Sequence, residues 1–388
     1  MKQNKLIQKI LITSGLLFLF SCKKENIPYD ATPKTFGEVF NIFWNQVNRN
    51  YLYWEIDSTN WNEAYSTYKP LFEKLNLNNE NDLKKSVFYF KDMCKSLVDG
   101  HFYIDFTKSQ IDDSLVYPSF DRKKKSNLFH NPFPYFTIVK NYLDSNYYEG
   151  IDNITNPSGI PLYTLAGTID NKALYFHCSS FTLLRSFSSV QNNNAKPVLN
   201  YLFENLRSPS PNIKGIILDL RNNSGGNLSD LNFLAGQFIY TPLHFGFTRH
   251  KNGNGRLEYS PWLNAYINPQ RRTTINNLPI IILVDSYSAS ITELITLALK
   301  CLSQKVVVIG ENTWGATGPI TSTEVYNFGN FEINGFMSVQ LSSAAFKTKE
   351  NNIYESSGIP PDIPIPFDKF SLQNGHDKML ERAIIELL

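Results

Sequence analysis

The stretch from residue 278 to residue 318 constrains the fold more than any other part of the chain. It begins with a short apolar, β-branched run from Pro279 to Val284, which is typical of a buried strand. Small polar residues follow from Asp285 to Ser290, and apolar residues recur at helical spacing from Ile291 to Lys300. This order predicts a strand, a tight turn that contains serines, and a helix with free N-terminal N–H groups. Such a turn can expose a serine hydroxyl as a nucleophile, although serine is also a common helix N-cap.

A second strand-and-turn stretch lies upstream. The segment from Ile216 to Leu220 predicts another buried strand, and Asp-Leu-Arg at its end is followed by Asn-Asn-Ser-Gly-Gly. Gly225 and Gly226 have no side chains, so the backbone N–H groups of this turn can face a ligand. The same residues also suit an ordinary strand-to-helix turn, because Asn, Ser and Gly are common in turns. Both turns follow strand ends, and in a parallel sheet such ends share one ligand-binding edge.

These two stretches resemble the S41 serine peptidases, which are also called C-terminal processing or tail-specific peptidases. The resemblance rests on DLRNNSGG, VDSYSASITE and GENTWGATG, which occur in the order of the family. It implies that Ser290 is the nucleophile and that Glu293 matches the glutamate that follows the family's serine. It also implies that the backbone N–H groups of Gly225, Gly226 and Ile291 form the oxyanion hole.

The chain lacks the lysine base that the processing peptidases carry in a G-K-G triplet. It has Gly-Ala-Thr-Gly at residues 315–318, and neither alanine nor threonine can act as that base. The stretch LVDGHFY instead resembles the tricorn-like branch of the family, in which a histidine is the base and a late glutamate orients it. This resemblance implies that His101 is the base and that Glu355, in YESSGIPPD, is the acid. The alternatives are a histidine in an ordinary turn and a glutamate without a catalytic role.

The N-terminus resembles a bacterial lipoprotein signal. Lys2 and Lys5 precede an apolar run from Ile10 to Phe20, which is short for a transmembrane helix, and Ser-Cys follows. The ending resembles a lipobox and implies lipidation of Cys22, with a plain signal anchor as the alternative. A lipid would tether the protein to a membrane face of the cell envelope without spanning the bilayer.

The remaining chain divides into a tether over residues 23–34 and three folded regions. Hydrophobic spacing predicts an N-terminal helical domain over 35–100, followed by a strand-and-loop region over 101–165. This second region is too short for the PDZ domain of many processing peptidases, and its basic run at 122–125 is typical of a solvated loop. Alternating strands and helices over 166–388 predict an α/β domain with βαβ crossovers and a largely parallel sheet. The resemblance implies a ClpP/crotonase-like catalytic domain there.

Composition and motifs exclude several other functions. The formal net charge is +2, which gives no argument for nucleic acid as a partner. The chain has no C-x-x-C pair and no phosphate-binding P-loop, so we expect no metal and no cofactor. The resemblances to the S41 peptidases and to a lipobox imply a membrane-tethered serine endopeptidase of the cell envelope that cuts protein or peptide substrates. The alternative is a catalytically inactive protein of the same fold that binds a peptide or a lipid.

Overall fold

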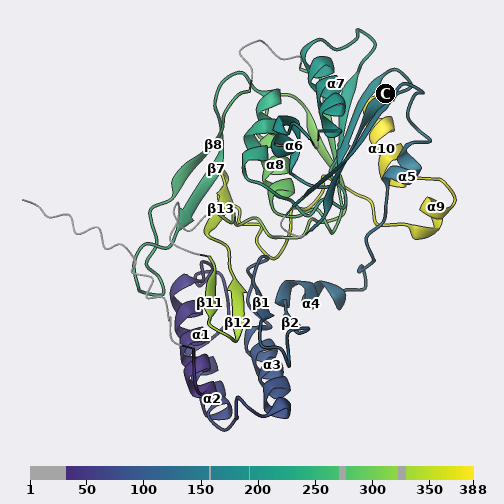
Figure 1. Cartoon of the computed structure of the whole chain (residues 1–388). Helices are drawn as coiled ribbons and strands as arrows, with labels where there is room; N and C mark the ends of the chain where they lie inside the picture. Colours follow the sequence, from purple (N-terminus) through teal and green to yellow (C-terminus); the bar gives the residue numbers. More distant parts are fainter. Residues whose placement is uncertain (1–31, 157–158, 192, 271–276, 322–328) are drawn as a thin grey trace, which may run out of the picture.

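The structure is a computed structural model that describes residues 32–156, 159–191, 193–270, 277–321 and 329–388 (Figure 1). Helices and a small sheet form one body, and a large sheet with helices on both faces forms the other. Cys22 and the predicted signal lie outside the described residues, so lipidation remains a prediction. Among the residues described, none of the helices combines the length and the apolar character that crossing a bilayer requires.

A seven-stranded sheet forms the centre of the larger body. Its strand order is β14-β10-β9-β6-β5-β4-β3. Neighbouring strands from β14 to β5 pair in parallel, whereas β4 pairs antiparallel with both β5 and β3. The strands are β3 Tyr148–Thr155, β4 Pro161–Ile169, β5 Ala173–Cys178, β6 Gly215–Asp219, β9 Ile280–Val284, β10 Val306–Gly310 and β14 Ile363–Pro364. Every residue of β6 and β9 is buried, as expected for central strands of a parallel sheet that is covered on both faces.

Helices cover both faces of this sheet (Figure 1). Alternate side chains divide between the two faces, so that Ile216 and Leu218 belong to one hydrophobic core and Ile217 to the other. The helical elements are α5 Phe136–Val139, α6 Leu183–Ser188, α7 Ala195–Arg207, the short turns η1 Leu231–Ala235 and η2 Gly236–Phe238, α8 Ile291–Lys300, α9 Lys369–Gln373 and α10 Lys378–Leu387. The first core contains residues of α7 and α8, and the second contains residues of α9 and α10.

The N-terminal helices pack on strands that come partly from near the C-terminus. The helices α1 Phe36–Asn50, α2 Trp61–Phe72 and α3 Glu80–Cys94 occur within the region predicted as helical. They share one core with an antiparallel sheet of order β11-β12-β1-β2. Its strands are β1 Tyr103–Phe106, β2 Leu115–Val116, β11 Phe331–Ile333 and β12 Met337–Gln340. The predicted boundaries at 100 and 165 therefore do not separate independent cores, because β11 and β12 complete the N-terminal body.

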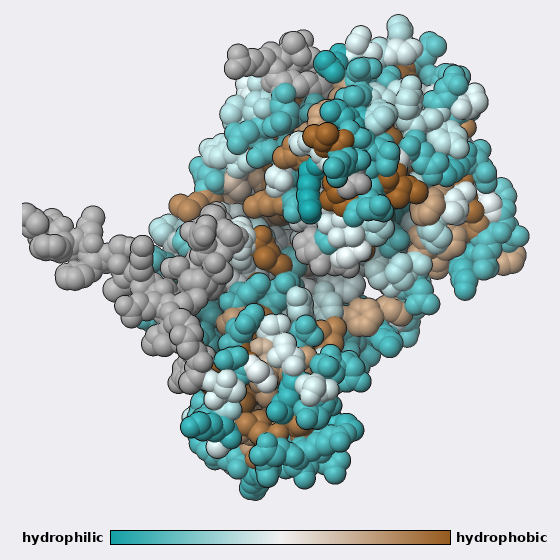
Figure 2. Space-filling model, viewed as in Figure 1, coloured by the Kyte–Doolittle hydropathy of each residue, from teal (hydrophilic) through white to brown (hydrophobic). Residues whose placement is uncertain are grey.

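A third sheet and one helix lie near the junction of the two bodies (Figure 1). The sheet has the order β13-β7-β8, with β7 Leu243–His250, β8 Leu263–Ile267 and β13 Ala344–Thr348. The helix is α4 Pro118–Lys124, which contains most of the basic run that was predicted as a loop. The face shown in Figure 2 is mostly hydrophilic, and its hydrophobic residues form separate patches, which is usual for a folded protein surface.

Candidate active site

Ser290 precedes α8 in a backbone conformation that residues with a side chain seldom adopt. Its φ is +60° and its ψ is −119°. Such a conformation costs on the order of 1–3 kcal/mol and persists only where the surrounding structure holds it. Ser288 supplies part of this support, because its Oγ accepts from the N–H of Asp285 at 3.0 Å and donates to the carbonyl of Leu220 at 2.8 Å. Ser288 therefore fixes the turn, and the side chain of Ser290 has a partner outside the turn.

His101 is that partner. The distance from His101 Nε2 to Ser290 Oγ is 3.1 Å, which is within hydrogen-bond range. The ring is carried by the short turn before β1, where the N–H of His101 donates to Asp99 Oδ1 at 2.9 Å. Burial lowers the pKa of His101 to about 4. The imidazole is therefore neutral at pH 7, and only the neutral form can accept a proton from serine.

The other ring nitrogen of His101 faces a residue that the sequence did not indicate. Ser342 Oγ lies 3.4 Å from His101 Nδ1 and donates to Asp99 Oδ1 at 2.8 Å. Because its proton is used on Asp99, the Ser342 oxygen can accept a hydrogen bond from an N–H at Nδ1. This arrangement favours the tautomer in which Nε2, the nitrogen facing Ser290, carries no proton. Strand pairing places Ser342 here, since β12 ends two residues before it and pairs with β1.

Glu355 lies close to this cluster but does not bond to the imidazole within the described structure. Its Oε1 accepts from the N–H of Gly100 at 2.7 Å. Its Oε2 accepts from Thr317 Oγ1 at 3.0 Å and from the N–H of Gly318 at 2.9 Å. Burial raises the pKa of this carboxyl group. The expectation that Glu355 orients the histidine directly is therefore not met. The carboxylate instead ties the turn before β1 to the loop where the processing peptidases carry their lysine.

Three side chains of the site are close enough together to bind a metal ion. One possible ligand atom from each lies within 4.8 Å of those of the other two, and the residues are Asp99, His101 and Glu355. Both carboxylates already accept hydrogen bonds, Asp99 from the side chain and backbone of Ser342 and Glu355 from three donors. A cation would have to replace these bonds. The donor set therefore fits the positioning of backbone and imidazole better than a metal centre.

The Gly-Gly turn lies against Ser290. A Cβ atom on Gly225 would come within 2.7 Å of the Ser290 Cβ, and the φ of Gly225 is +97°, so the position requires glycine. The N–H of Gly225 is already bonded to Asn223 Oδ1 at 2.9 Å. No hydrogen bond among the described residues uses the N–H groups of Gly226 or Ile291. Of the three predicted oxyanion donors, these two remain available to a ligand.

Glu293 is fully buried and holds the turn to the neighbouring loop. Its Oε2 accepts from the N–H of Ser290 at 3.0 Å and from the N–H of Ala316 at 2.8 Å. Its Oε1 accepts from the N–H of Gly315 at 2.7 Å and from the hydroxyl of Thr313. Four donors on one carboxylate make this residue a structural link next to the nucleophile.

The arginine of the DLR sequence is also structural. Arg221 is completely buried, and its guanidinium lies between the carboxylates of Asp219 and Asp377 at 2.6 and 2.8 Å. This pair of ion pairs connects the end of β6 to the start of α10. It fixes the strand from which the Gly-Gly turn departs.

Residues 172–365, half of the chain, match the sequence profile of peptidase family S41. The chain belongs to peptidase family S41. Among curated proteins, this S41 chain is 27% identical over 159 residues to the nisin-resistance protein of Lactococcus lactis subsp. lactis, which covers 39% of this chain and 46% of the relative. It is 28% identical over 150 residues to the carboxy-terminal processing protease CtpA of Bacillus subtilis, which covers 39% of this chain and 28% of the relative. The matches thus span less than half the length of these relatives.

Solved structures share the fold over nearly the whole S41 chain. A Parabacteroides merdae protein described as a candidate peptidase has a TM-score of 0.69 at 23% identity and covers 92% of this chain and 98% of its own. Mature CPAF has a TM-score of 0.60 at 12% identity and covers 91% of this chain and 97% of its own. At these identities the likeness concerns the fold alone. It confirms the predicted fold class, a mixed α/β protein with an N-terminal helical region and a large, mainly parallel sheet.

Proposed function

We propose that this S41 protein is a serine endopeptidase in which Ser290 is the nucleophile and His101 the general base. The supporting observation is the 3.1 Å separation of His101 Nε2 and Ser290 Oγ, with the imidazole held neutral by burial. Ser290 Oγ attacks the peptide carbonyl carbon while its proton moves to Nε2. His101 then gives this proton to the leaving amine as the C–N bond breaks, and water hydrolyses the resulting ester of Ser290.

The backbone donors and the residues behind the imidazole support the same steps. The N–H groups of Gly226 and Ile291 are free to donate to the oxygen that becomes negatively charged in the tetrahedral intermediate. Ser342 accepts from His101 Nδ1, and the Asp99 carboxylate behind it stabilises the imidazolium that forms. The lysine of the processing peptidases is therefore replaced by a histidine from the other body of the molecule.

The proposal includes the place of action. The basic N-terminus, the short apolar run and the Ser-Cys ending support lipidation of Cys22. A lipid there would tether the peptidase to a membrane of the cell envelope, where protein or peptide substrates would be cut.

Labelling of the purified protein with a fluorophosphonate probe tests the mechanism. We expect wild type to be labelled, Ser290→Ala to be unlabelled, and His101→Ala to label at least about a hundredfold more slowly because the base is lost. His376→Ala is the matched control, since this histidine is exposed and far along the chain from the site. Wild-type labelling of the Ser290→Ala protein would contradict the assignment of the nucleophile. Wild-type rates in His101→Ala would contradict the assignment of the base.

A second candidate is a binding protein that keeps the fold without turnover. The observation that favours it is the buried Ala316 beside Thr317 in the loop where the processing peptidases carry their lysine. Saturable binding of peptides, with no labelling of wild type and no cleavage after long incubation, would support this candidate over the peptidase.

A further inference from the structure

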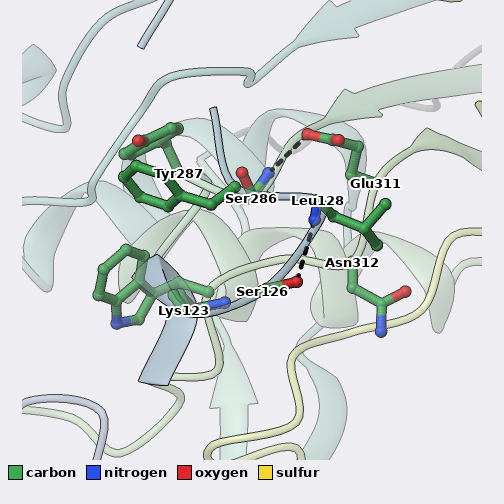
Figure 3. A pocket seen from close by; sticks show the side chains of 9 residues that line it. Lys123, Ser126, Leu128, Ser286, Tyr287, Glu311 and Asn312 are labelled. Atoms are coloured by element: carbon green, nitrogen blue, oxygen red, sulfur yellow. Dashed lines mark hydrogen bonds between the residues drawn. The ribbon is translucent and has the colours of Figure 1, made fainter. Parts of the chain in front are cut away.

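A pocket of about 150 Å³ opens beside the turn that carries the nucleophile (Figure 3). Its walls are mostly apolar and include Leu128, Phe129, Tyr287 and Trp314. In Figure 3, Lys123 of α4 lies across the pocket from Tyr287, which belongs to the turn between β9 and α8. The pocket is thus formed by α4 and the segment after it on one side and by the catalytic loops on the other.

The pocket is within reach of a peptide that is bound at Ser290. Tyr287 is three residues before Ser290, so their Cα atoms are at most about 11 Å apart. The N–H of Trp314 donates to the carbonyl of Ser288 at 2.8 Å, and its indole N–H faces the carbonyl of Gly100 at 3.4 Å. An extended peptide advances about 3.3 Å per residue. A substrate residue within about three positions of the cleaved bond can therefore enter this pocket.

Lys123 brings a positive charge into these apolar surroundings. Its Nζ lies 4.9 Å above the centre of the Trp314 ring and donates to the carbonyl of Thr313 at 3.4 Å. Among the described residues, no carboxylate forms an ion pair with this ammonium group. Burial lowers the pKa of Lys123, which means that the surroundings solvate its charged form less well than water does.

Glu311, the acidic residue of the pocket, forms its ion pair with His130 and not with Lys123. Glu311 Oε2 lies 2.8 Å from His130 Nε2, and His130 Nδ1 lies 2.9 Å from the carbonyl of Asn131. Both partners only accept hydrogen bonds, so the ring needs a proton on each nitrogen to make both. The imidazolium then offsets the charge of Glu311, and Lys123 is the cation of the pocket that has no ion-pair partner among the described residues.

We propose that this pocket is a specificity subsite that binds a bulky apolar side chain of a peptide together with a carboxylate that pairs with Lys123. The apolar walls accept the side chain and exclude water, which strengthens the pair between the carboxylate and the ammonium group. The carboxylate belongs either to an acidic side chain next to the apolar residue or to the end of the peptide. The inference rests on the proposed function, because that function makes a peptide the ligand.

Binding to the full-length Ser290→Ala protein tests this subsite without cleavage. The probes are four decapeptide mixtures with a central Phe-Glu or Phe-Gln, each with a free or an amidated C-terminus. We expect the mixtures that carry the recognised carboxylate to bind on the order of tenfold more tightly, the size of a charge-assisted hydrogen bond. A preference for Glu over Gln would identify a side-chain carboxylate, and a preference for the free over the amidated terminus would identify the chain end.

Substitutions at two lysines of the same helix decide whether Lys123 is responsible. In Lys123→Met the preference should fall to about twofold or less, whereas Lys123→Arg should retain it because the charge is kept. Lys124→Met is the matched control, since Lys124 is exposed and its loss changes the net charge equally. Thermal unfolding midpoints check that each variant is folded, and Lys123→Gln replaces Lys123→Met if the latter unfolds.

The outcomes separate this inference from the proposed function. Equal binding of all four mixtures, or an unchanged preference in the folded Lys123→Met and Lys123→Gln proteins, would refute the subsite even if fluorophosphonate labels Ser290. A preference that depends on Lys123 in a protein that the probe does not label would support the subsite and refute the peptidase.

Discussion

Replacement of Ser342 by alanine tests the arrangement behind the catalytic imidazole. The hydroxyl of Ser342 lies between Asp99 and His101, at 2.8 Å from Asp99 Oδ1 and 3.4 Å from His101 Nδ1. Ser342→Ala removes the acceptor for the Nδ1 proton and leaves the two tautomers of the imidazole closer in free energy. The tautomer with a proton on Nε2 cannot accept the proton of Ser290, so the rate of attack should fall.

The size of the effect follows from the lost hydrogen bond. A neutral hydrogen bond contributes about 0.5–1.5 kcal/mol, and one to a charged group about 1.5–3 kcal/mol. The 3.4 Å separation is long for the resting state, but the ring becomes an imidazolium in the transition state and the bond then involves a charge. A loss of about 1.4–2.7 kcal/mol corresponds to a fall in kcat of about 10- to 100-fold. KM should change little, because the described contacts place Ser342 behind the ring and away from the Ser290 hydroxyl.

Steady-state kinetics on a cleaved peptide and the rate of fluorophosphonate labelling measure this effect. Ser343→Ala is the matched control, because Ser343 is equally buried but bonds to Thr321 and not to His101. If Ser342→Ala retained the kcat of Ser343→Ala, the proposal that this hydroxyl positions the base would be wrong. A rise in KM at unchanged kcat would also refute it, since that pattern indicates lost substrate binding.

Three further predictions concern the pKa of His101, the Gly-Gly turn and the N-terminal cysteine. His101 must be unprotonated to act as base, and burial lowers its pKa to about 4. As the pH is lowered, kcat/KM should therefore stay constant through pH 6.5 and fall only near pH 4. An inflection at the ordinary histidine pKa of about 6.5 would contradict this. Gly225→Ala should abolish labelling and lower the free energy of unfolding. The loss should exceed that of the control Gly375→Ala, because Gly375 also has a positive φ but has open space around it. Equal destabilisation of the two variants in urea titrations would count against the close approach of Gly225 to Ser290. Cys22→Ser should abolish incorporation of a radiolabelled fatty acid during expression, and an unlabelled wild type would refute lipidation.

The sequence predicted those parts of the fold and site that local patterns encode. Apolar β-branched runs at 216–220 and 279–284 indicated buried strands, and the structure pairs both in one parallel sheet. The Gly-Gly turn and Ser290 lie in the turns after these two strands. The pairing of the strands in the sheet therefore places the two turns close together. His101 was identified by its resemblance to a family motif, and the structure brings its ring within 3.1 Å of Ser290.

The remaining features depend on contacts that local sequence does not determine. Ser342 reaches His101 because Tyr103 of β1 pairs with Gln340 of β12, and nothing in the residues around Ser342 indicates that register. The basic run at 122–125 suggested a solvated loop, yet Lys123 packs its charge over Trp314 because a lysine stem can cover an aromatic ring. The resemblance indicated that Glu355 lies near His101. It did not indicate that the Glu355 side chain accepts from the N–H of Gly100 and not from the imidazole, because that depends on side-chain geometry.

The loss of the lysine has a structural consequence for the whole molecule. Ser290 and the free N–H groups belong to the body built on the seven-stranded sheet, whereas His101 and Ser342 flank the paired strands β1 and β12 of the N-terminal body. The separation of Ser290 from His101 is therefore set by how the two bodies dock. Gly100 is one point of contact, since its N–H donates to Glu355 and its carbonyl accepts from the indole of Trp314. In this S41 chain the packing between bodies, and not a single loop, brings Ser290 and His101 together. The N-terminal helices and β11 support that alignment, because they form the core on which β1 and β12 rest.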